Sequence, residues 1–175
     1  MDDEKERVIT MQKGLLLLLE QMAKLQEELL PLEEEKKEVL IRGEISRLSE
    51  IVHLETQKIN LLSKLERERE KAAEELAFAW NLPPESLTLS ALTDRMEDPC
   101  LKGRFQELQK LLNERSQQLQ RQNEINQILI RESLDYVNMA FSLLTDQEDS
   151  KVYSNHPSEE GEKSSSPRSF FDTRI

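Results

Sequence analysis

The fold of this chain is decided by residues 35–51, EKKEVLIRGEISRLSEI, where two amphipathic segments meet at Arg42-Gly43. On each side of the glycine, apolar residues recur every three or four positions, which is the spacing of one helix face. Glycine is the residue that most readily leaves a helix in the left-handed conformation. The stretch therefore predicts a tight turn between two antiparallel helices.

Upstream of this turn, the sequence predicts a helix over about residues 4–41. Its apolar residues follow steps of three and four, which is a heptad seam. They are Val8, Met11, Leu15, Leu18, Met22, Leu25, Leu29 and Leu32. Pro31 lies within the seam and removes a backbone donor, so we expect a kink, or at worst a break, at this residue.

Downstream of the turn, a second helix is expected over about residues 44–80, and its two apolar stripes indicate neighbours on two sides. The stripes are Ile45, Leu48, Val52, Ile59 and Leu62, and Ile51, Leu54, Leu61, Leu65, Ala72 and Leu76. Pro83-Pro84 stops this helix. Phe78 and Trp80, just before its end, are expected to cap a core, with a functional anchor as the alternative.

The rest of the chain predicts one more long helix and a tail. A short helix is expected near residues 90–96, and Asp98-Pro99 is typical of the start of a helix, here covering about residues 98–144. The fold class is therefore all-α, an elongated antiparallel three-helix bundle or coiled coil over residues 1–145. Residues 146–175 are acidic and rich in serine, so we expect a disordered tail.

Composition narrows the possible partners. The net charge is −11 and 34% of the residues are charged. Nucleic acids and anionic membranes attract clustered Lys and Arg, so this composition argues against both. The N-terminus is acidic and the apolar run at residues 15–19 is short, so neither a signal peptide nor a membrane insertion is expected. Cys100 is the only cysteine and requires no oxidising compartment, so we expect a cytoplasmic protein.

The sequence offers little chemistry for catalysis. His53 and His156 lie far apart, and neither has other metal ligands at a suitable spacing. No glycine-rich phosphate loop and no nucleophile elbow occurs in the sequence. We therefore expect no metal site, no cofactor and no enzymatic activity.

The second half of the third long helix has more apolar residues than a single seam requires. We expect this surface to bind a further helix from outside. The alternative is that the same residues pack against the first two helices. The candidate client-binding residues are Ile125, Ile128, Leu129, Leu134, Val137, Phe141 and Leu144.

Two asparagines, Asn123 and Asn126, interrupt the apolar seam in the stretch QNEINQ, residues 122–127. A polar layer within a coiled coil fixes the register of the helices at some loss of stability. The layer also marks a possible boundary between a well-packed bundle and a looser end that a partner helix can enter. The two interpretations are compatible.

The chain resembles the FlgN-type flagellar export chaperones, which are small, acidic helical proteins of the cytoplasm. The resemblance covers most of residues 1–155. It is carried by EKKEVLIRGEISRLSEI at the first turn, by the order of the elements and by LQRQNEINQILIRESLDYVNMAFSLL, residues 119–144, with Asn123 and Asn126.

This resemblance implies a chaperone that binds the C-terminal helices of hook-filament junction proteins through its last long helix. It also implies delivery of these clients to the cytoplasmic domain of the flagellar type III export gate. Tyr153 matches the family's tail tyrosine, which contacts that gate. The competing hypothesis is a structural coiled-coil homo-oligomer or a helical adaptor without a role in secretion. The aromatic pair Phe170-Phe171 in the tail is a further candidate docking segment.

Overall fold

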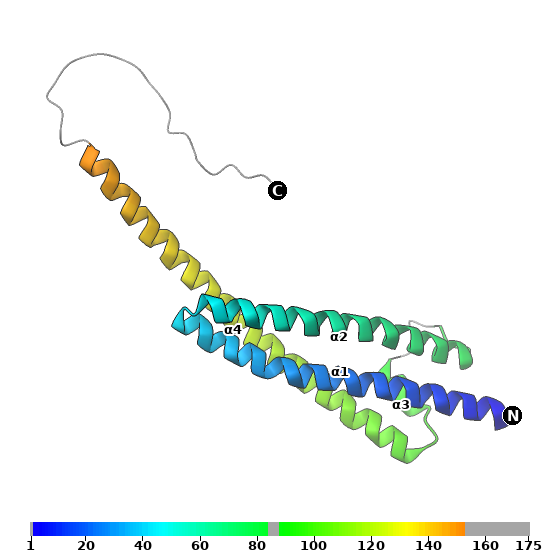
Figure 1. Ribbon diagram of the computed structural model, residues 1–175. Helices are drawn as coiled ribbons and strands as arrows, with labels where there is room; N and C mark the ends of the chain where they lie inside the picture. The colour runs from blue at the N-terminus through cyan, green and yellow to red at the C-terminus, as the bar shows by residue number, and fades with distance from the viewer. Residues whose placement is uncertain (1, 84–87, 153–175) are drawn as a thin grey trace, which may run out of the picture. The chain divides into compact units, whose positions relative to one another are not determined.

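The computed structural model of the 175-residue chain describes residues 2–83 and 88–152, with side chains for residues 4–83 and 88–145. Most of the described residues are helical: α1 is Asp2–Arg42, α2 is Ile45–Ala79, α3 is Leu89–Asp94 and α4 is Pro99–Val152 (Figure 1). The chain divides into two units between Ser133 and Leu134, inside α4. Within the described ranges, no helix combines the length and hydropathy needed to cross a membrane.

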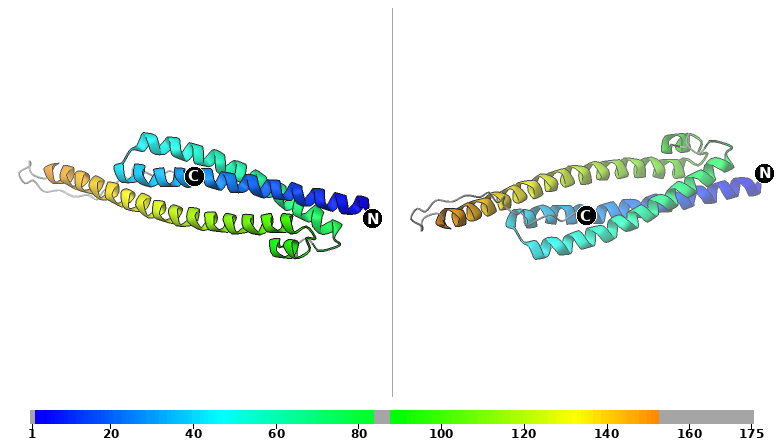
Figure 2. Two further views of the ribbon diagram at one scale, coloured as in Figure 1. Left: turned by 90° about the horizontal axis from the view of Figure 1, so that it is seen from below. Right: turned by 90° about the horizontal axis from the view of Figure 1, so that it is seen from above.

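The turn at Gly43 has the expected form. Gly43 has a φ of +69°, and its N–H donates to Leu40 O at 3.3 Å while the N–H of Glu44 donates to Val39 O at 3.1 Å. These two bonds satisfy carbonyls that the end of α1 leaves without partners. The predicted tight turn is confirmed, and α1 and α2 lie side by side and antiparallel (Figure 2).

The other helix ends also follow local signals. Asn81 has a φ of +52°, and Leu82 N–H donates to Ala77 O at 2.9 Å, which closes α2 in the same way that Gly43 closes α1. Thr88 caps α3 by accepting from Ala91 N at 3.1 Å. Asp98 Oδ1 accepts from Cys100 N at 2.8 Å at the start of α4. The short helix expected near residues 90–96 and the helix start at Asp98-Pro99 are both confirmed.

The structure decides one alternative that the sequence left open and moves the end of one helix. α1 continues through Pro31, so no break occurs there. Ion pairs to α2 hold α1 on both sides of the proline, from Glu28 to Lys58 and from Glu35 to Arg47. At the other end of the chain, α4 continues past residue 144 to Val152. Several of the added residues are Gln, Glu or Lys, which are good helix formers.

The apolar core of the first unit lies where the four helices meet. It contains Leu15, Leu16, Leu19 and Ala23 of α1, Leu76 of α2, Leu92 of α3, and Leu101, Phe105 and Leu108 of α4, together with Met96. Phe105 is completely buried. This core fixes the start of α4 against α1, and α3 lies beside the start of α4 (Figure 2).

The predicted seam of α1 is partly wrong. Leu15 and Leu29 are buried, but Met22, Leu25 and Leu32 are only half-buried. The most buried line of α1 instead contains Gln12, Leu16, Leu19, Ala23, Gln26, Leu29, Glu33, Lys36 and Val39. The reason is that α1 has two neighbours, so its deepest line lies between the face toward α2 and the face toward α4.

The apolar stripes of α2 are also less buried than their spacing indicates. Ile51 and Leu76 have no exposed surface, whereas Val52, Leu54, Ile59 and Leu61 are each at least 40% exposed. A single neighbour along most of α2 buries the line through Ile51 and leaves the flanking residues open. The expectation of neighbours on two sides is therefore wrong for this part of α2 within the described residues.

Contacts between α1 and α4 set the direction of α4 in the first unit. Arg115 of α4 donates to Ala23 O at 2.6 Å and to the carboxylate of Glu27 at 2.9 Å. Further along both helices, Asn126 contacts Glu33. Residue numbers rise together along the contact, so this part of α4 is parallel to α1.

Candidate functional site

A buried polar layer joins α1, α2 and α4 near the hairpin turn. Lys36 Nζ donates to Glu33 Oε1 at 3.0 Å and to the two carboxylate oxygens of Glu55 at 2.7 and 2.8 Å. Asn126 Nδ2 donates to Glu33 Oε2 at 2.7 Å and to the Glu33 carbonyl at 2.9 Å. Every one of these four residues is more than nine-tenths buried, so the layer places charge in the interior at this end of the unit, where Val39 and Ile51 are also buried.

The two carboxylates of the layer share one cation and differ in acidity. Burial and a hydrogen bond with Glu33 raise the pKa of Glu55, although Lys36 opposes this shift. Burial also acts on Glu33, but hydrogen bonds with Glu55, Lys36 and Asn126 outweigh it and lower the pKa of Glu33. Negative charge is therefore favoured on Glu33, which has the additional donor from α4.

At the layer and one helical turn before it, α4 has two unsatisfied polar groups. Asn126 Oδ1 and Gln122 Nε2 are buried and have no hydrogen-bond partner. Asn126 Oδ1 is an acceptor and Gln122 Nε2 is a donor, and the two residues are four positions apart on the same face of α4. Asn123 is only half-buried and accepts from Gln127 Nε2 at 2.7 Å. Of the two asparagines singled out in the sequence, only Asn126 lies in the layer.

On both sides of Asn126 the packing of α4 becomes looser, and beyond it the packing ends within the first unit. Ile125 is 40% exposed and Ile128 is 50% exposed, while Leu129 is half-buried. Residues 127–133 include no buried side chain. Asn126 is thus the last buried residue of α4 in this unit.

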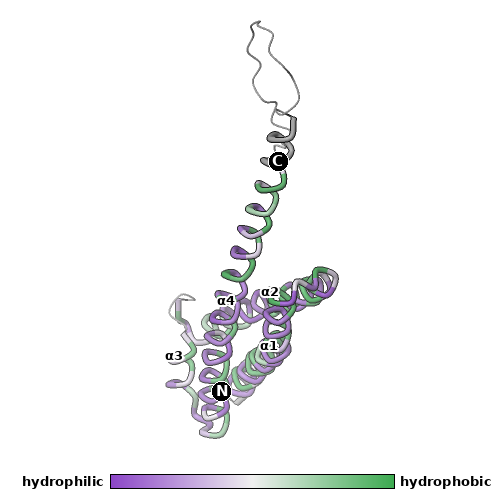
Figure 3. Tube along the Cα trace, turned by 90° about the vertical axis from the view of Figure 1, so that its left-hand side faces the viewer, coloured by the Kyte–Doolittle hydropathy of each residue, from purple (hydrophilic) through white to green (hydrophobic). Residues whose placement is uncertain are grey.

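The described part of the second unit is a helix with two apolar faces. Leu134, Val137, Phe141 and Leu144 follow steps of three, four and three residues, and each is at least 57% exposed. Tyr136, Met139 and Leu143 form a second face with the same kind of spacing and similar exposure. Hydrophobic residues therefore recur on successive turns of this segment (Figure 3). Met139 was not among the candidate residues chosen from the sequence. Its spacing of three residues from Tyr136 and four from Leu143 could have placed it on this face.

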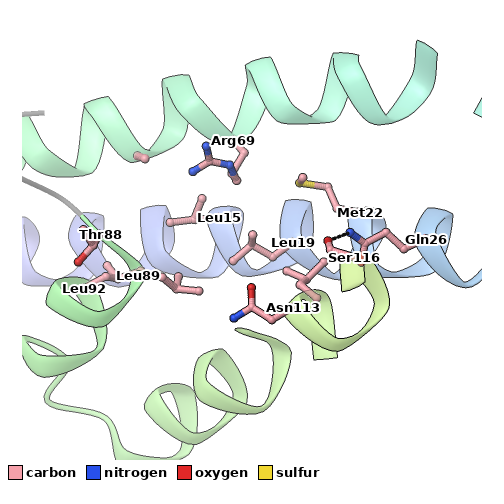
Figure 4. A pocket seen from close by; sticks show the side chains of 12 residues that line it. Leu15, Leu19, Met22, Gln26, Arg69, Thr88, Leu89, Leu92, Asn113 and Ser116 are labelled. Carbon is pink, nitrogen blue, oxygen red and sulfur yellow. Dashed lines mark hydrogen bonds between the residues drawn. The ribbon is translucent and has the colours of Figure 1, made fainter. Parts of the chain in front are cut away.

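A pocket of about 260 Å³ lies within the first unit, among α1, α2, α3 and α4 (Figure 4). Leu15, Leu19 and Leu92 form part of its apolar lining, and Gln26 Nε2 donates to Ser116 Oγ at 2.9 Å beside it. Its volume is below the roughly 300–1,000 Å³ of pockets that bind drug-sized ligands. No group of three or more metal-ligating residues was found in the described ranges.

A profile of the FlgN protein family matches residues 11–160. The chain belongs to the FlgN family. A relative from Bacillus subtilis (strain 168), described as "Uncharacterized protein YvyG", is 30% identical over 161 residues, which cover 90% of this chain and 96% of the relative. No solved structure matches the chain.

This assignment confirms the family expected from the first turn and from the segment around Asn126. The FlgN family is a family of chaperones rather than of enzymes. For this FlgN-family chain, the matched region includes the polar layer and both apolar faces of α4. Tyr153 and Phe170-Phe171 lie outside the described residues.

Proposed function

We propose that this chain is a cytoplasmic export chaperone that binds the C-terminal helices of flagellar hook-filament junction proteins and delivers them to the type III export gate. One observation carries the proposal: α4 presents exposed apolar residues from Ile125 to Leu144. In this proposal the helices of the first unit form the scaffold, and the residues after Val152 serve as the tail.

The proposed chaperone acts by covering the surface that the client uses for its own assembly. Terminal helices that are built for assembly are amphipathic, so they self-associate unless another apolar surface covers them. A helix of the client laid along Leu134, Val137, Phe141 and Leu144 would bury apolar area on both partners. The second face, through Tyr136 and Met139, offers room for another client helix. Binding stabilises the unassembled client by mass action and requires no nucleotide.

Delivery to the gate is assigned to the tail. Tyr153 follows α4 directly in the sequence and is the proposed contact with the cytoplasmic domain of the export gate. A weak contact on a tether gains strength from the high effective concentration that the tether provides. In this division of labour, Tyr153→Ala leaves client binding intact and weakens delivery. If Tyr153→Ala loses client binding, the separation of client binding from gate delivery is wrong.

Co-purification of a client with charge variants of α4 tests the client site. We expect Ile128→Asp and Phe141→Asp to abolish co-purification while thermal unfolding stays cooperative. Asn138→Asp is the matched control, because Asn138 is exposed on the same helix and lies between the two apolar faces. If Ile128→Asp and Phe141→Asp instead melt the protein, these residues belong to a core and the client site is wrong.

Self-association is the competing use of the same surface. Light scattering of the purified chain distinguishes the two. A monomer that forms a complex with added client supports the chaperone. A stable homo-oligomer that ignores the client supports a structural role and contradicts our proposal.

A further inference from the structure

The first half of α2 has an exposed face with a regular apolar repeat, here called the outer face of α2. Ile45, Val52 and Ile59 stand seven residues apart on it and are 73%, 45% and 47% exposed. They belong to the stripe whose spacing predicted a second neighbour for α2. A seven-residue repeat of apolar residues is typical of a helix that packs along another helix. The described chain supplies such a neighbour on the Ile51 side of α2 only.

The outer face of α2 has no Asp, Glu, Lys or Arg over residues 45–63. Its polar residues repeat with the same period of seven, are all exposed, and are Ser46, Ser49, His53, Thr56, Asn60 and Ser63. The equivalent positions one repeat further on are Glu66, Arg67 and Glu70, so the uncharged surface ends there. Charged residues make up 34% of the chain, so their absence from this face is a marked departure. Depletion of charge is characteristic of the centre of a protein–protein interface.

The apolar residues of this face are symmetric about Val52. Ile45 lies seven residues before it and Ile59 seven residues after it. When two copies of α2 pack antiparallel with their Val52 residues opposite each other, Ile45 of each copy meets Ile59 of the other. Both ends of the contact then match. The face is thus complementary to itself, as a two-fold symmetric interface requires.

Charge and hydrogen bonding both permit a second copy at this face. Each copy has a net charge of −11, so association is opposed wherever charged faces meet. The uncharged outer face of α2 avoids this repulsion. The Thr56 hydroxyl already donates to Val52 O at 2.7 Å, so covering it leaves no donor unpaired. A second helix can therefore cover Val52 and Thr56 without burying a charge.

We propose that this chain forms a two-fold symmetric dimer in which the outer faces of α2 from two copies pack antiparallel about Val52. Ile45, Val52 and Ile59 of each copy form the apolar centre, and the uncharged polar residues border it. The interface includes no residue of α4, so dimerisation and client binding use different residues. This dimer therefore differs from a homo-oligomer that competes with the client for α4.

Sedimentation equilibrium of the full-length protein, over a range of concentrations, measures this association. We expect a reversible equilibrium between monomer and dimer. Val52→Glu should weaken the dimer by about a hundredfold or more, because it places two carboxylates opposite each other at the symmetry axis. Leu54→Glu is the matched control, since Leu54 is an apolar residue of α2 that is 40% exposed but lies outside the outer face. It should leave the dimer unchanged, and circular dichroism checks that both variants are folded.

Cysteine cross-linking tests the antiparallel arrangement in a Cys100→Ser background, which removes the only native cysteine. Val52→Cys should form a disulfide between two copies under mild oxidation. Ile45→Cys alone should not, because its two copies lie about 21 Å apart along the helices and a disulfide needs Cα atoms within about 7 Å. Mixing Ile45→Cys chains with Ile59→Cys chains should restore cross-linking.

Three outcomes overturn the proposal. The first is a monomer at every concentration. The second is a dimer that Leu54→Glu or Phe141→Asp dissociates and Val52→Glu does not, because its interface lies elsewhere. The third is cross-linking of Ile45→Cys with itself, because it requires parallel helices. The Val52→Glu chain also supplies a monomer for the test of client binding, so the dimer and the client site can fail separately.

Discussion

Asn126 of α4 donates to both the carboxylate and the backbone carbonyl of Glu33 of α1, at 2.7 and 2.9 Å. The two residues are separated by 93 positions in the sequence. A side chain that bonds the backbone and the carboxylate of one partner fixes both the position and the rotation of α4 on α1. This contact also lies where α4 makes its last buried contact in the first unit.

The first prediction concerns this contact. Asn126→Ala should lower the free energy of unfolding by about 1–3 kcal/mol, because Glu33 loses the two hydrogen bonds that it accepts from Asn126 Nδ2 in a buried site. Asn123→Ala is the matched control and should cost about 0.5 kcal/mol or less, since Asn123 is half-buried and bonds only Gln127. Urea denaturation followed by circular dichroism measures both. Equal losses would show that the layer is not specific to Asn126.

The second prediction concerns the pH dependence of Glu33 and Glu55. The lowered pKa of Glu33 contributes stability that is present above the ordinary value of 4.5 and is lost as the pH falls through its folded pKa. The raised pKa of Glu55 contributes stability that is fully present below 4.5 and is lost as the pH rises through its folded pKa.

The variants Glu33→Gln and Glu55→Gln should therefore show opposite trends. The destabilisation caused by Glu33→Gln should shrink as the pH falls below 4.5, whereas that caused by Glu55→Gln should grow as the pH falls from neutral toward 4.5. Denaturant titrations from neutral to acidic pH measure the two differences. Parallel trends would refute the assigned difference in acidity.

The third prediction concerns Gly43. Gly43→Ala should destabilise the protein by about 1–2 kcal/mol, because φ is +69° and a side chain there is strained even though no atom lies within 4 Å of the added Cβ. Gly14→Ala and Gly103→Ala are controls inside α1 and α4, also with no atom within 4 Å. Each should stabilise by about 1 kcal/mol, through helix propensity. Thermal unfolding separates the three variants, and stabilisation by Gly43→Ala would contradict the prediction.

The fourth prediction concerns Pro31. Because α1 continues through it and the residue is exposed, Pro31→Ala should stabilise the protein by up to about 3 kcal/mol by restoring a donor toward the carbonyl of Glu27. The neighbouring exposed residue supplies the control, Glu34→Ala, which should change stability by about 0.5 kcal/mol or less. A loss of stability in Pro31→Ala would mean that the proline shapes α1 in a way that the bundle requires.

Local signals predicted much of the fold. Gly43, Asp98 and Pro99 each act within one turn of the chain, so their effects follow from residue type alone. The family also followed from sequence, through the first turn and the segment around Asn126. Residue type alone could not predict which residues of α1 are most buried, or which residues Asn126 contacts. Both depend on packing against helices that are distant in sequence.

The buried charges were the hardest feature to predict. Glu33, Lys36 and Glu55 stand among many exposed Glu and Lys residues, and nothing in their spacing marks them as buried. Only their contacts in the structure show that they are buried. Both carboxylates accept a hydrogen bond from Lys36, and Glu33 also accepts one from Asn126. Asn126 was recognisable because it replaces an apolar residue in a seam, whereas a charged residue on a charged helix gives no such contrast.

The interior along α1 changes from hydrocarbon around Leu16 and Leu19 to hydrogen-bonded charge around Glu33 and Lys36. Burial of hydrocarbon weakens on cooling, whereas the paired carboxylates respond to protons. The two ends of a single helix are therefore controlled by different solution variables. Protonation of Glu33 in acid weakens its ion pair with Lys36 at the hairpin end, beside the start of the exposed part of α4, whereas cooling acts on the hydrocarbon at the other end.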